Sequence, residues 1–174
     1  MNALSTAVIV AASFAVIAAA KPAAPAFTIA SADFSSGGTM PTADAYDKGG
    51  CPGKNISPEL HWTGAPAGTK SFALTVFDPD AHGGWWHWVV YGIDPETADL
   101  AQAEPFPGLE GKTSFGTSGY GGPCPPVGDA PHHYIFTLYA LDAAVGGSLT
   151  GPQLLKAIDG HVLGKASVVG RFGR

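Results

Sequence analysis

Charged residues are scarce in this 174-residue sequence, where Asp, Glu, Lys and Arg together make up 13 % of the chain. Only nine residues are Lys or Arg, they form no cluster, and the formal net charge is −5. Nucleic-acid backbones are bound through clustered basic side chains, so we expect no nucleic-acid partner. Any anionic ligand must be held by local groups, against the overall charge of the chain.

Turn-forming residues are abundant instead, with 24 Gly and 15 Pro. Few charges and many turn formers are typical of short strands joined by tight loops, and they disfavour a helical bundle. The length fits a single domain with a buried core. The sequence shows no internal repeat and no domain-length linker.

Long apolar runs are missing, with one exception near the N-terminus. The first twenty residues carry no charged side chain, and the segment 8–20 is almost entirely small or apolar. Because this run ends in three alanines, residues 1–20 resemble a secretory signal peptide, and 21–26 a flexible tether. An uncleaved membrane anchor is the alternative, although about 20 apolar residues are needed to span a bilayer. We expect a periplasmic or secreted protein with no membrane span after cleavage.

Cysteine is rare, and Cys51 and Cys124 are the only two in the chain. Their spacing matches no metal-binding pattern such as C-x-x-C. In an exported protein we expect them to form a disulfide, and closing a loop of about 70 residues would stabilise the fold by roughly 4 kcal/mol. The alternative is two unrelated buried thiols.

Apolar segments predict the strands of a mainly β fold. The segment from Ser71 to Phe77 is apolar on both faces, which is typical of a central strand covered on both sides. Other strands are predicted from their aromatic and β-branched residues, and two short ones flank a Ser-Ser-Gly-Gly turn near the start. These further segments are His87–Ile93, His132–Leu141, Ala166–Phe172, Phe27–Ile29 and Thr39–Met40.

One helix is expected near the C-terminus. Thr150 and Gln153 fit a capping box, and Pro152 lies in the first turn, where its missing N–H costs nothing. Apolar residues then recur at helical spacing, and Gly164 is suited to end the helix. Together these elements predict an antiparallel β-sandwich with one C-terminal helix. The residues at helical spacing are Leu154, Leu155, Ile158, Val162 and Leu163.

Side chains suited to ligand binding gather in two short stretches. Each stretch places a histidine on a predicted strand beside a turn that proline stiffens. A neutral imidazole donates one hydrogen bond to a phosphate oxygen, and an imidazolium adds charge, so the two stretches predict two walls of one anion pocket. The residues are Asp78, Asp80 and His87 in the first stretch, and Cys124, Pro125, His132 and Tyr134 in the second.

Each of these signals also has a plainer interpretation. A histidine at a strand end is more often a structural hydrogen-bonding group than a ligand contact, and Asp-Pro-Asp alone is an ordinary turn. The Gly-Pro-Cys-Pro-Pro segment alone could be a disulfide-bearing loop. Trp85, Trp86 and Trp88 fit packing in the core and at its rim better than a stacking platform.

The order and spacing of the motifs resemble the phosphatidylethanolamine-binding protein family, also called the Raf-kinase-inhibitor-protein family, and above all its bacterial branch. The resemblance runs from about Phe27 to Arg174. It rests on Asp-Pro-Asp-Ala, Trp-His-Trp, Gly-x-Cys-Pro-Pro-x-Gly and His-x-Tyr in a fixed order.

This resemblance implies a β-sandwich with a small anion pocket that takes phosphate, acetate or a phosphorylethanolamine head group. Two departures concern the rim of the pocket and its pH response. His82 stands where the family has Pro, the loop that follows it is shorter than usual, and His133 replaces the Arg of His-Arg-Tyr. The pocket residues that the resemblance implies are Asp78, Asp80, His87, Cys124 through its backbone, Pro125, His132 and Tyr134.

We therefore expect a non-enzymatic protein that binds a phospholipid head group or another small phosphate-like anion and uses no cofactor or metal. In this family the same surface can inhibit kinases or proteases, so the resemblance also implies modulation of an unidentified protein partner. If imidazolium supplies the attraction, phosphate affinity should rise as the pH falls through about 6–7.

Two other classes of protein stay open. A copper-binding β-sandwich needs two His and a Cys with a weak axial ligand, but both methionines lie far upstream of Cys124. A weak phosphoesterase could use Asp78 or Asp80 with His87 for acid–base chemistry, although no Gly-x-Ser-x-Gly motif supplies a nucleophile.

Overall fold

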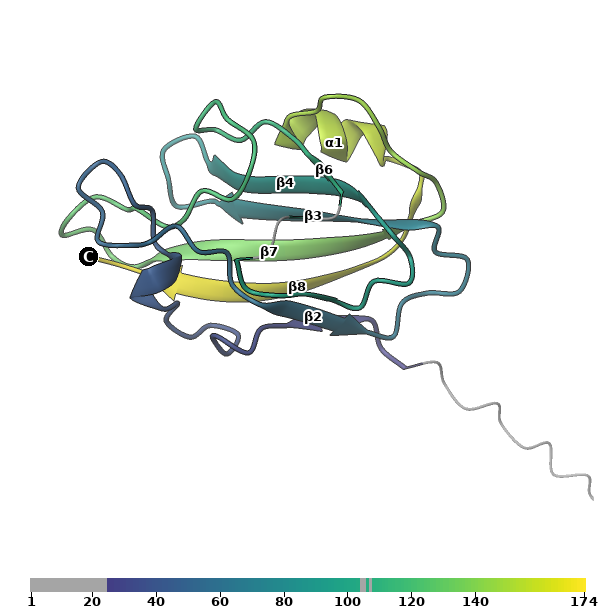
Figure 1. Ribbon diagram of the computed structural model, residues 1–174, viewed down its shortest axis with the longest axis horizontal. Coiled ribbons are helices and arrows are strands. Elements are labelled where there is room, and N and C mark those ends of the chain that lie inside the picture. Colours follow the sequence, from purple (N-terminus) through teal and green to yellow (C-terminus); the bar gives the residue numbers. More distant parts are fainter. Residues whose placement is uncertain (1–24, 104–105, 107) are drawn as a thin grey trace, which may run out of the picture.

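The computed structural model describes residues 25–103, 106 and 108–174. Within these ranges the chain forms two antiparallel sheets and one α-helix (Figure 1), as the sequence predicts for a β-sandwich with a C-terminal helix. The predicted signal peptide, 1–20, and residues 21–24 of the predicted tether lie outside the described residues. Over the described ranges, no helix combines the length and hydropathy needed to cross a membrane.

The larger sheet consists of β6 (Leu109–Glu110), β4 (Trp85–Ile93), β3 (Ser71–Asp78), β7 (His132–Leu141) and β8 (Val162–Phe172), in that spatial order. Every neighbouring pair in it is antiparallel. β3 lies in the middle and is buried along almost its whole length. Its continuous apolar sequence is therefore explained by cover on both faces.

The smaller sheet consists of β1 (Thr28–Ala30), β2 (Leu60–Thr63) and β5 (Asp99–Leu100), with β2 in the middle. It packs on one face of the larger sheet, and side chains from both sheets form a single buried cluster. Trp62 of β2 meets Phe72 of β3 edge-on, with ring centroids 5.6 Å apart. This layer is the main hydrophobic core.

The helix α1 (Gly151–Ala157) covers the opposite face of the larger sheet, close to β4 (Figure 1). Leu154 and the C-cap residue Ile158 are buried there in a second cluster with residues of β3, β4 and β7. At the other end of the helix, the Thr150 backbone N–H donates to Gln153 Oε1 over 2.9 Å, as the capping-box sequence predicts.

The predicted end of the helix at Gly164 is wrong. The helix ends at Ala157, and Gly160 adopts a left-handed φ of 79° that turns the chain back. Val162 and Leu163 already belong to β8 and are about 40 % exposed. Their helical spacing is overridden because β8 forms backbone hydrogen bonds with β7 along its length.

Two strand predictions also need correction. Thr39–Met40 is not a strand, since Thr39 forms only an isolated parallel bridge with Arg171. β4 begins at Trp85, so His87 is its third residue rather than its first. Between these parts of the chain, a short 3-10 helix, η1 (Thr42–Asp44), leads into the loops beside the cavity described below.

Candidate functional site

A cavity of about 640 Å³ opens at the end of the larger sheet where β3 ends and β7 begins. The structure brings together all seven residues that the sequence singled out, although they come from three separate parts of the chain. The residues lining it are Asp78, Asp80, His87, Cys124, Pro125, His132 and Tyr134, together with others described below.

Asp78 is fixed by the turn that follows β3. Its Oδ1 accepts hydrogen bonds from the backbone N–H groups of Asp80 (2.8 Å) and Ala81 (3.2 Å). Pro79 stiffens the intervening backbone by holding its own φ. The side chain of Asp78 is therefore held in one orientation, with Oδ2 free to accept a further hydrogen bond.

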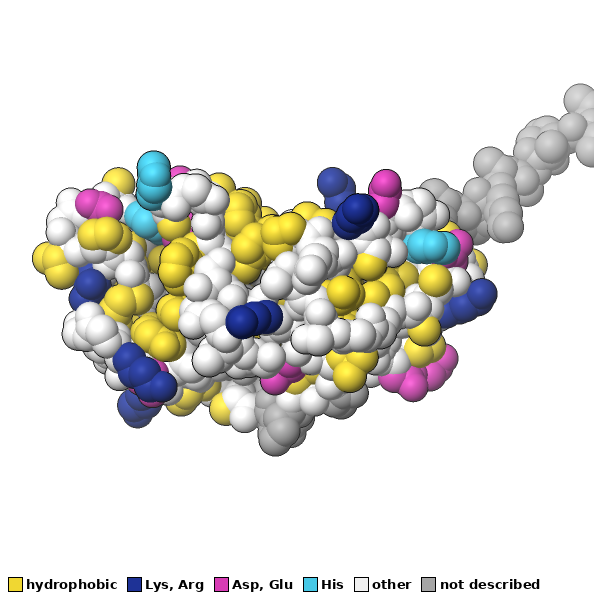
Figure 2. Space-filling view, turned by 90° about the horizontal axis from the view of Figure 1, so that it is seen from above, with side chains coloured by type: hydrophobic (Ala, Val, Ile, Leu, Met, Phe, Trp, Pro, Cys, Tyr) yellow, Lys and Arg dark blue, Asp and Glu magenta, His cyan; other side chains and the backbone are white. Residues whose placement is uncertain are grey.

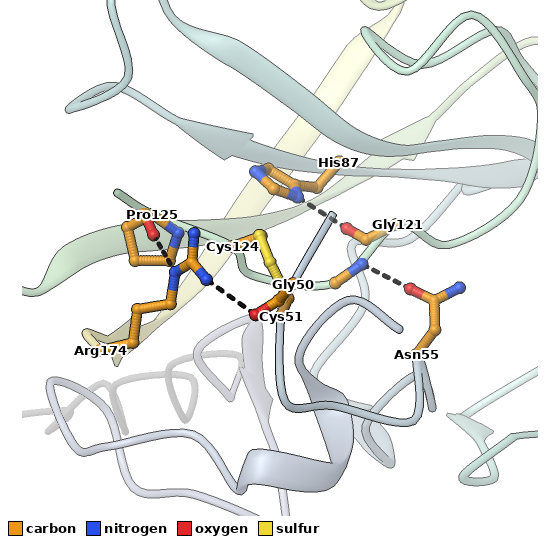
Figure 3. The surroundings of a disulfide bond; sticks show 9 residues. Gly50, Cys51, Asn55, His87, Gly121, Cys124, Pro125 and Arg174 are labelled. Atoms are coloured by element: carbon orange, nitrogen blue, oxygen red, sulfur yellow. Dashed lines mark hydrogen bonds between the residues drawn. A yellow bond between two sulfur atoms is a disulfide. The ribbon is translucent and has the colours of Figure 1, made fainter. Parts of the chain in front are cut away.

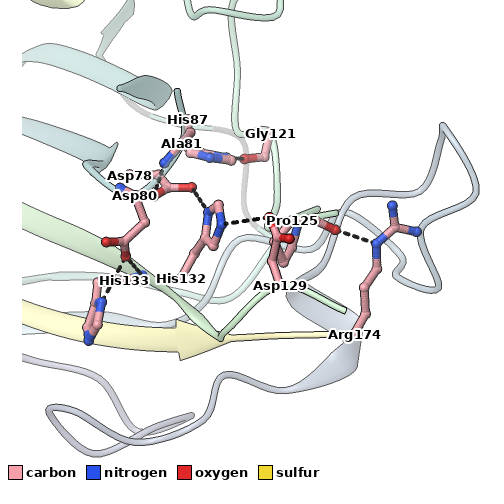
Figure 4. A network of polar contacts seen from close by, with 10 residues as sticks. All are labelled: Asp78, Asp80, Ala81, His87, Gly121, Pro125, Asp129, His132, His133 and Arg174. Atoms are coloured by element: carbon pink, nitrogen blue, oxygen red, sulfur yellow. Dashed lines mark hydrogen bonds and ion pairs between the residues drawn. The ribbon is translucent and has the colours of Figure 1, made fainter. Parts of the chain in front are cut away.

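His132 supplies that hydrogen bond from the first residue of the neighbouring strand β7. Its Nδ1 lies 2.7 Å from Asp78 Oδ2, and both residues are buried (Figure 4). The other ring nitrogen, Nε2, lies 3.8 Å from Asp129 Oδ2. Because a carboxylate only accepts hydrogen bonds, Nδ1 carries a proton, and Nε2 is a donor only in the imidazolium form of the ring.

His87 faces the cavity from β4 with a different partner. Its Nδ1 lies 2.6 Å from the backbone carbonyl oxygen of Gly121 (Figures 3 and 4). Burial lowers the pKa of this ring to about 4, against the opposite effect of the Gly121 hydrogen bond and of the Asp78 charge. His87 is therefore a neutral imidazole at physiological pH. The predicted attraction through an imidazolium between pH 6 and 7 cannot come from this residue.

Tyr134 follows His132 by two residues on β7, so both side chains point to the same face of the sheet. Its ring meets the His87 ring edge-on, with centroids 5.0 Å apart. Burial, and next the Asp78 charge, raise the pKa of the Tyr134 hydroxyl. The hydroxyl therefore stays protonated and can donate to an anion in the cavity.

Asp80 lies at the rim and is tied to His133. Its Oδ2 accepts from the His133 backbone N–H over 2.7 Å and lies 2.8 Å from His133 Nδ1. These hydrogen bonds lower the pKa of the Asp80 carboxyl. His133, the residue that stands in place of the family's Arg, thus braces the turn after β3 from outside. His82, the second departure, lines the cavity itself.

The wall opposite the strands is the loop around Cys124, which forms a disulfide with Cys51 (Figure 3). The Arg174 guanidinium donates to the carbonyl oxygens of Pro125 and Gly50, which lie on the two sides of the disulfide. Cys124 and Pro125 are thus held by contacts to segments far away in the sequence. This wall has little freedom to reorganise when a ligand enters.

Nine lining residues were not included in the predicted site, and besides His82 five of these have aromatic or charged side chains. An aromatic side of the cavity has Phe115 at its centre, with ring centroids 4.6 Å from Tyr46 and 5.4 Å from Trp85. Lys48 and Asp129 add charged side chains to the lining. Of these five residues, only Asp129 had a signal in the sequence that could have revealed it, because it lies three residues before His132. The other four residues lie in loops or at a strand end and fit no motif. They are Tyr46, Lys48, Trp85 and Phe115.

The charge around the cavity is mixed rather than strongly positive. Three aspartates and one lysine line it, together with the imidazoles. Figure 2 shows, on one face of the molecule, histidine beside acidic side chains at both ends, and Lys and Arg at several separate places. Binding of an anion here would depend on directed hydrogen bonds rather than on a general positive field.

The disulfide conflicts with the copper site that the sequence left open. In the part of the chain that the structure describes, no three His, Cys, Asp or Glu side chains are grouped as metal ligands. Cys124, which a copper site would need as a thiolate, is occupied in the disulfide.

Comparison with known proteins places this chain in a wider group. The family model described as phosphatidylethanolamine-binding protein matches residues 30–173. The UPF0098 protein YbcL of Escherichia coli K12 is 41 % identical over 149 residues, covering 75 % of this chain and 81 % of that protein. The putative lipoprotein LppC of Mycobacterium tuberculosis H37Rv is 43 % identical over 155 residues, covering 87 % of this chain and 74 % of that protein.

Solved structures agree with the sequence matches. The crystal structure of E. coli YbcL, described as a new member of the mammalian PEBP family, has a TM-score of 0.79 and 35 % identity, covering 85 % of this chain and 98 % of that one. A putative phosphatidylethanolamine-binding protein homologue, CT736 of Chlamydia trachomatis, has a TM-score of 0.78 and 36 % identity, covering 86 % and 98 %. On the family match and these relatives, the chain belongs to the phosphatidylethanolamine-binding protein family.

Proposed function

We propose that this protein binds a small phosphate-like anion, such as a phospholipid head group, without transforming it chemically. The observation that carries the proposal is the Asp78–His132 pair beside the Tyr134 hydroxyl in one cavity. Charge-assisted donors of this kind bind oxyanions more strongly than neutral ones. Family membership supports the same class of ligand.

The size of the cavity supports a ligand larger than the anion alone. Its volume of about 640 Å³ lies within the range of small-molecule sites, which is roughly 300–1,000 Å³. The aromatic side formed by Tyr46, Trp85 and Phe115 would contact the organic part of the ligand, while His132 and Tyr134 would hold the oxyanion.

Binding without turnover is favoured by the groups that surround the cavity. Its described lining contains no Ser or Thr, and the only Cys is oxidised, so the usual nucleophiles are lacking there. Both oxygens of Asp78 already accept hydrogen bonds, which disfavours attack by this carboxylate. We therefore rank a phosphoesterase that uses these residues below a binding protein.

We further propose that the protein works outside the cytoplasm, in the periplasm or as a secreted protein. The disulfide between Cys51 and Cys124 supports this location. So does the similarity to a mycobacterial protein named as a putative lipoprotein.

Isothermal titration calorimetry with phosphate and phosphorylethanolamine tests the binding proposal. Tyr134→Phe and His132→Asn should each weaken binding by about tenfold, since each removes a hydrogen bond to a charged ligand. His161→Asn is the matched control, because His161 forms an exposed pair with Asp142 outside the cavity. The proposal would be contradicted if neither phosphate nor phosphorylethanolamine binds. It would also be contradicted if the two cavity variants and the control bind with equal affinity. Release of phosphate from an ester by the wild type, lost in His132→Asn, would favour the enzyme instead.

A further inference from the structure

The two histidines of the cavity differ in the group that their Nδ1 atoms meet. His132 Nδ1 faces the Asp78 carboxylate, whereas His87 Nδ1 faces the carbonyl oxygen of Gly121 over 2.6 Å. A carbonyl oxygen only accepts hydrogen bonds. The Nδ1 atom of His87 must therefore carry the proton, which fixes the tautomer of the neutral ring.

The backbone around Gly121 holds this arrangement in place. The Gly121 N–H donates back to the His87 carbonyl oxygen over 2.9 Å. The next residue, Gly122, donates to Asn55 Oδ1 over 2.7 Å. Because Gly121 is tied on both sides, its carbonyl stays directed at the His87 ring, and the ring cannot exchange its tautomer without losing this hydrogen bond.

The free nitrogen of His87 is consequently an acceptor. Nε2 forms no hydrogen bond with the described residues, and His87 lines the cavity. Burial keeps the ring neutral by lowering its pKa to about 4. The titratable groups facing it are Asp78 from β3 and His132 and Tyr134 from β7. The other titratable groups around the same cavity are Tyr46, Lys48, Asp80, His82 and Asp129.

The cavity thus offers donors and an acceptor to the same ligand. Tyr134 can donate, and so can His132 as an imidazolium, while the lone pair of His87 that faces the cavity needs a donor. A fully ionised oxyanion has only lone pairs, and placing one against the Nε2 atom leaves two acceptors opposed with no proton between them. A site built around such a hydrogen bond discriminates strongly against ligands that lack the matching group.

We propose that His87 selects oxyanions that carry an acidic proton, namely inorganic phosphate and phosphomonoesters in their singly protonated form, over sulfate and phosphodiesters. The ligand P–OH donates to His87 Nε2, and its ionised oxygens accept from His132 and Tyr134. This inference rests on the proposed function and narrows it, because the head group of an intact diacyl phospholipid is a phosphodiester without a P–OH.

Calorimetric titrations with phosphate, methyl phosphate, dimethyl phosphate and sulfate at pH 5 to 8 test this selection. At pH 6 we expect the first two to bind at least tenfold more tightly than the last two. The affinity for methyl phosphate should fall as the pH rises through the second pKa of the ligand, about 6 for a phosphomonoester. Sulfate does not titrate in this range, so any pH dependence of its binding reports on the protein alone.

His87→Gln provides the matched variant, because a Gln amide can turn its NH₂ group to the ligand. The ratio of phosphate to sulfate affinity should then fall by at least tenfold, while His161→Gln should leave the ratio unchanged. Equal binding of phosphate and sulfate by the wild type at pH 6 would overturn the selection but leave anion binding standing. Failure of all four ligands to bind would refute the proposed function itself. If His87→Gln does not fold, the wild-type series decides alone.

Discussion

Asp78 and His132 form a buried pair across the β3–β7 boundary, with His132 Nδ1 2.7 Å from Asp78 Oδ2. The two residues are 54 positions apart in the sequence. They meet because β3 ends and β7 begins at the same end of the larger sheet, in neighbouring antiparallel strands. The carboxylate is otherwise held by backbone N–H groups, so the imidazole is its one side-chain partner among the described residues.

Replacing Asp78 by Asn should weaken phosphate binding by about tenfold at pH 6. The amide oxygen can still accept from Asp80 and Ala81, so the turn is kept. The charged acceptor of the His132 hydrogen bond is lost, and charge-assisted hydrogen bonds are roughly twice as strong as neutral ones. Calorimetry measures the affinity, and Asp142→Asn is the control, because it removes the carboxylate from the exposed His161 pair. Equal losses in both variants would show that the buried pair has no special role.

The stability of the protein should fall as the pH rises from about 4 to about 7, because of Asp44. This residue is fully buried, and its carboxylate oxygens have no hydrogen-bond partner among the described residues. Burial, and next the charge of Asp33, raise its pKa from 3.8 to about 7. The folded state then binds a proton that the unfolded state has released, so the stabilisation present below pH 3.8 is lost as the pH passes 7.

Asp44→Asn should remove this pH dependence and make the protein more stable than the wild type at pH 8, by a few kcal/mol at most. Urea denaturation at pH 4, 6 and 8 measures the free energy of unfolding. If the free energy of unfolding of the wild type instead rises with pH in this interval, and the variant shows the same slope as the wild type, then Asp44 is ionised at neutral pH.

The disulfide should contribute about 4 kcal/mol to stability, since it closes a long loop in the unfolded chain. Cys51 and Cys124 are separated by 73 positions. The double variant Cys51→Ser/Cys124→Ser should therefore unfold at lower urea concentration than the oxidised wild type, and reduced wild type should match the variant. Phosphate affinity should fall by less than about tenfold, because Arg174 still holds Pro125 in place. Unchanged stability after reduction would show that other contacts alone fix this loop.

Much of the fold could be predicted because its central strands have distinctive sequences. β3 is apolar on both faces, and β7 is rich in aromatic and β-branched residues, as expected for buried strands. The short strands β2, β5 and β6 carry too few residues for a periodic signal. The end of α1 was misplaced because Val162 and Leu163 continue the helical spacing by coincidence, and only pairing with β7 overrides it.

The predicted site residues do lie around one cavity, but their hydrogen-bond partners could not be predicted. The sequence places Asp78 near two histidines and cannot decide between them. The structure pairs Asp78 with His132 and leaves His87 to the Gly121 carbonyl. That difference depends on loop geometry around Gly121, and it changes the expected role of His87 from a hydrogen-bond donor to an acceptor.

Gly122 should be essential for the wall of the cavity that carries Cys124. A Cβ atom at this position would lie 2.0 Å from the Asp44 carbonyl oxygen and 2.7 Å from the Tyr46 backbone nitrogen, both of which are backbone atoms. Gly122→Ala must therefore push the loop away from η1, and overpacking of this kind costs about 1–3 kcal/mol. Phosphate affinity should fall together with the free energy of unfolding, because the displaced loop lines the cavity.

Gly146→Ala is the matched control for this substitution. A Cβ atom at Gly146 meets no heavy atom within 4 Å, and its φ is not in the left-handed region. This variant should leave phosphate affinity unchanged and should be as stable as the wild type or slightly more so, because alanine restricts the unfolded chain. Denaturation and calorimetry on both variants separate the two positions. If Gly122→Ala behaves like Gly146→Ala, then close backbone packing under this loop does not shape the site.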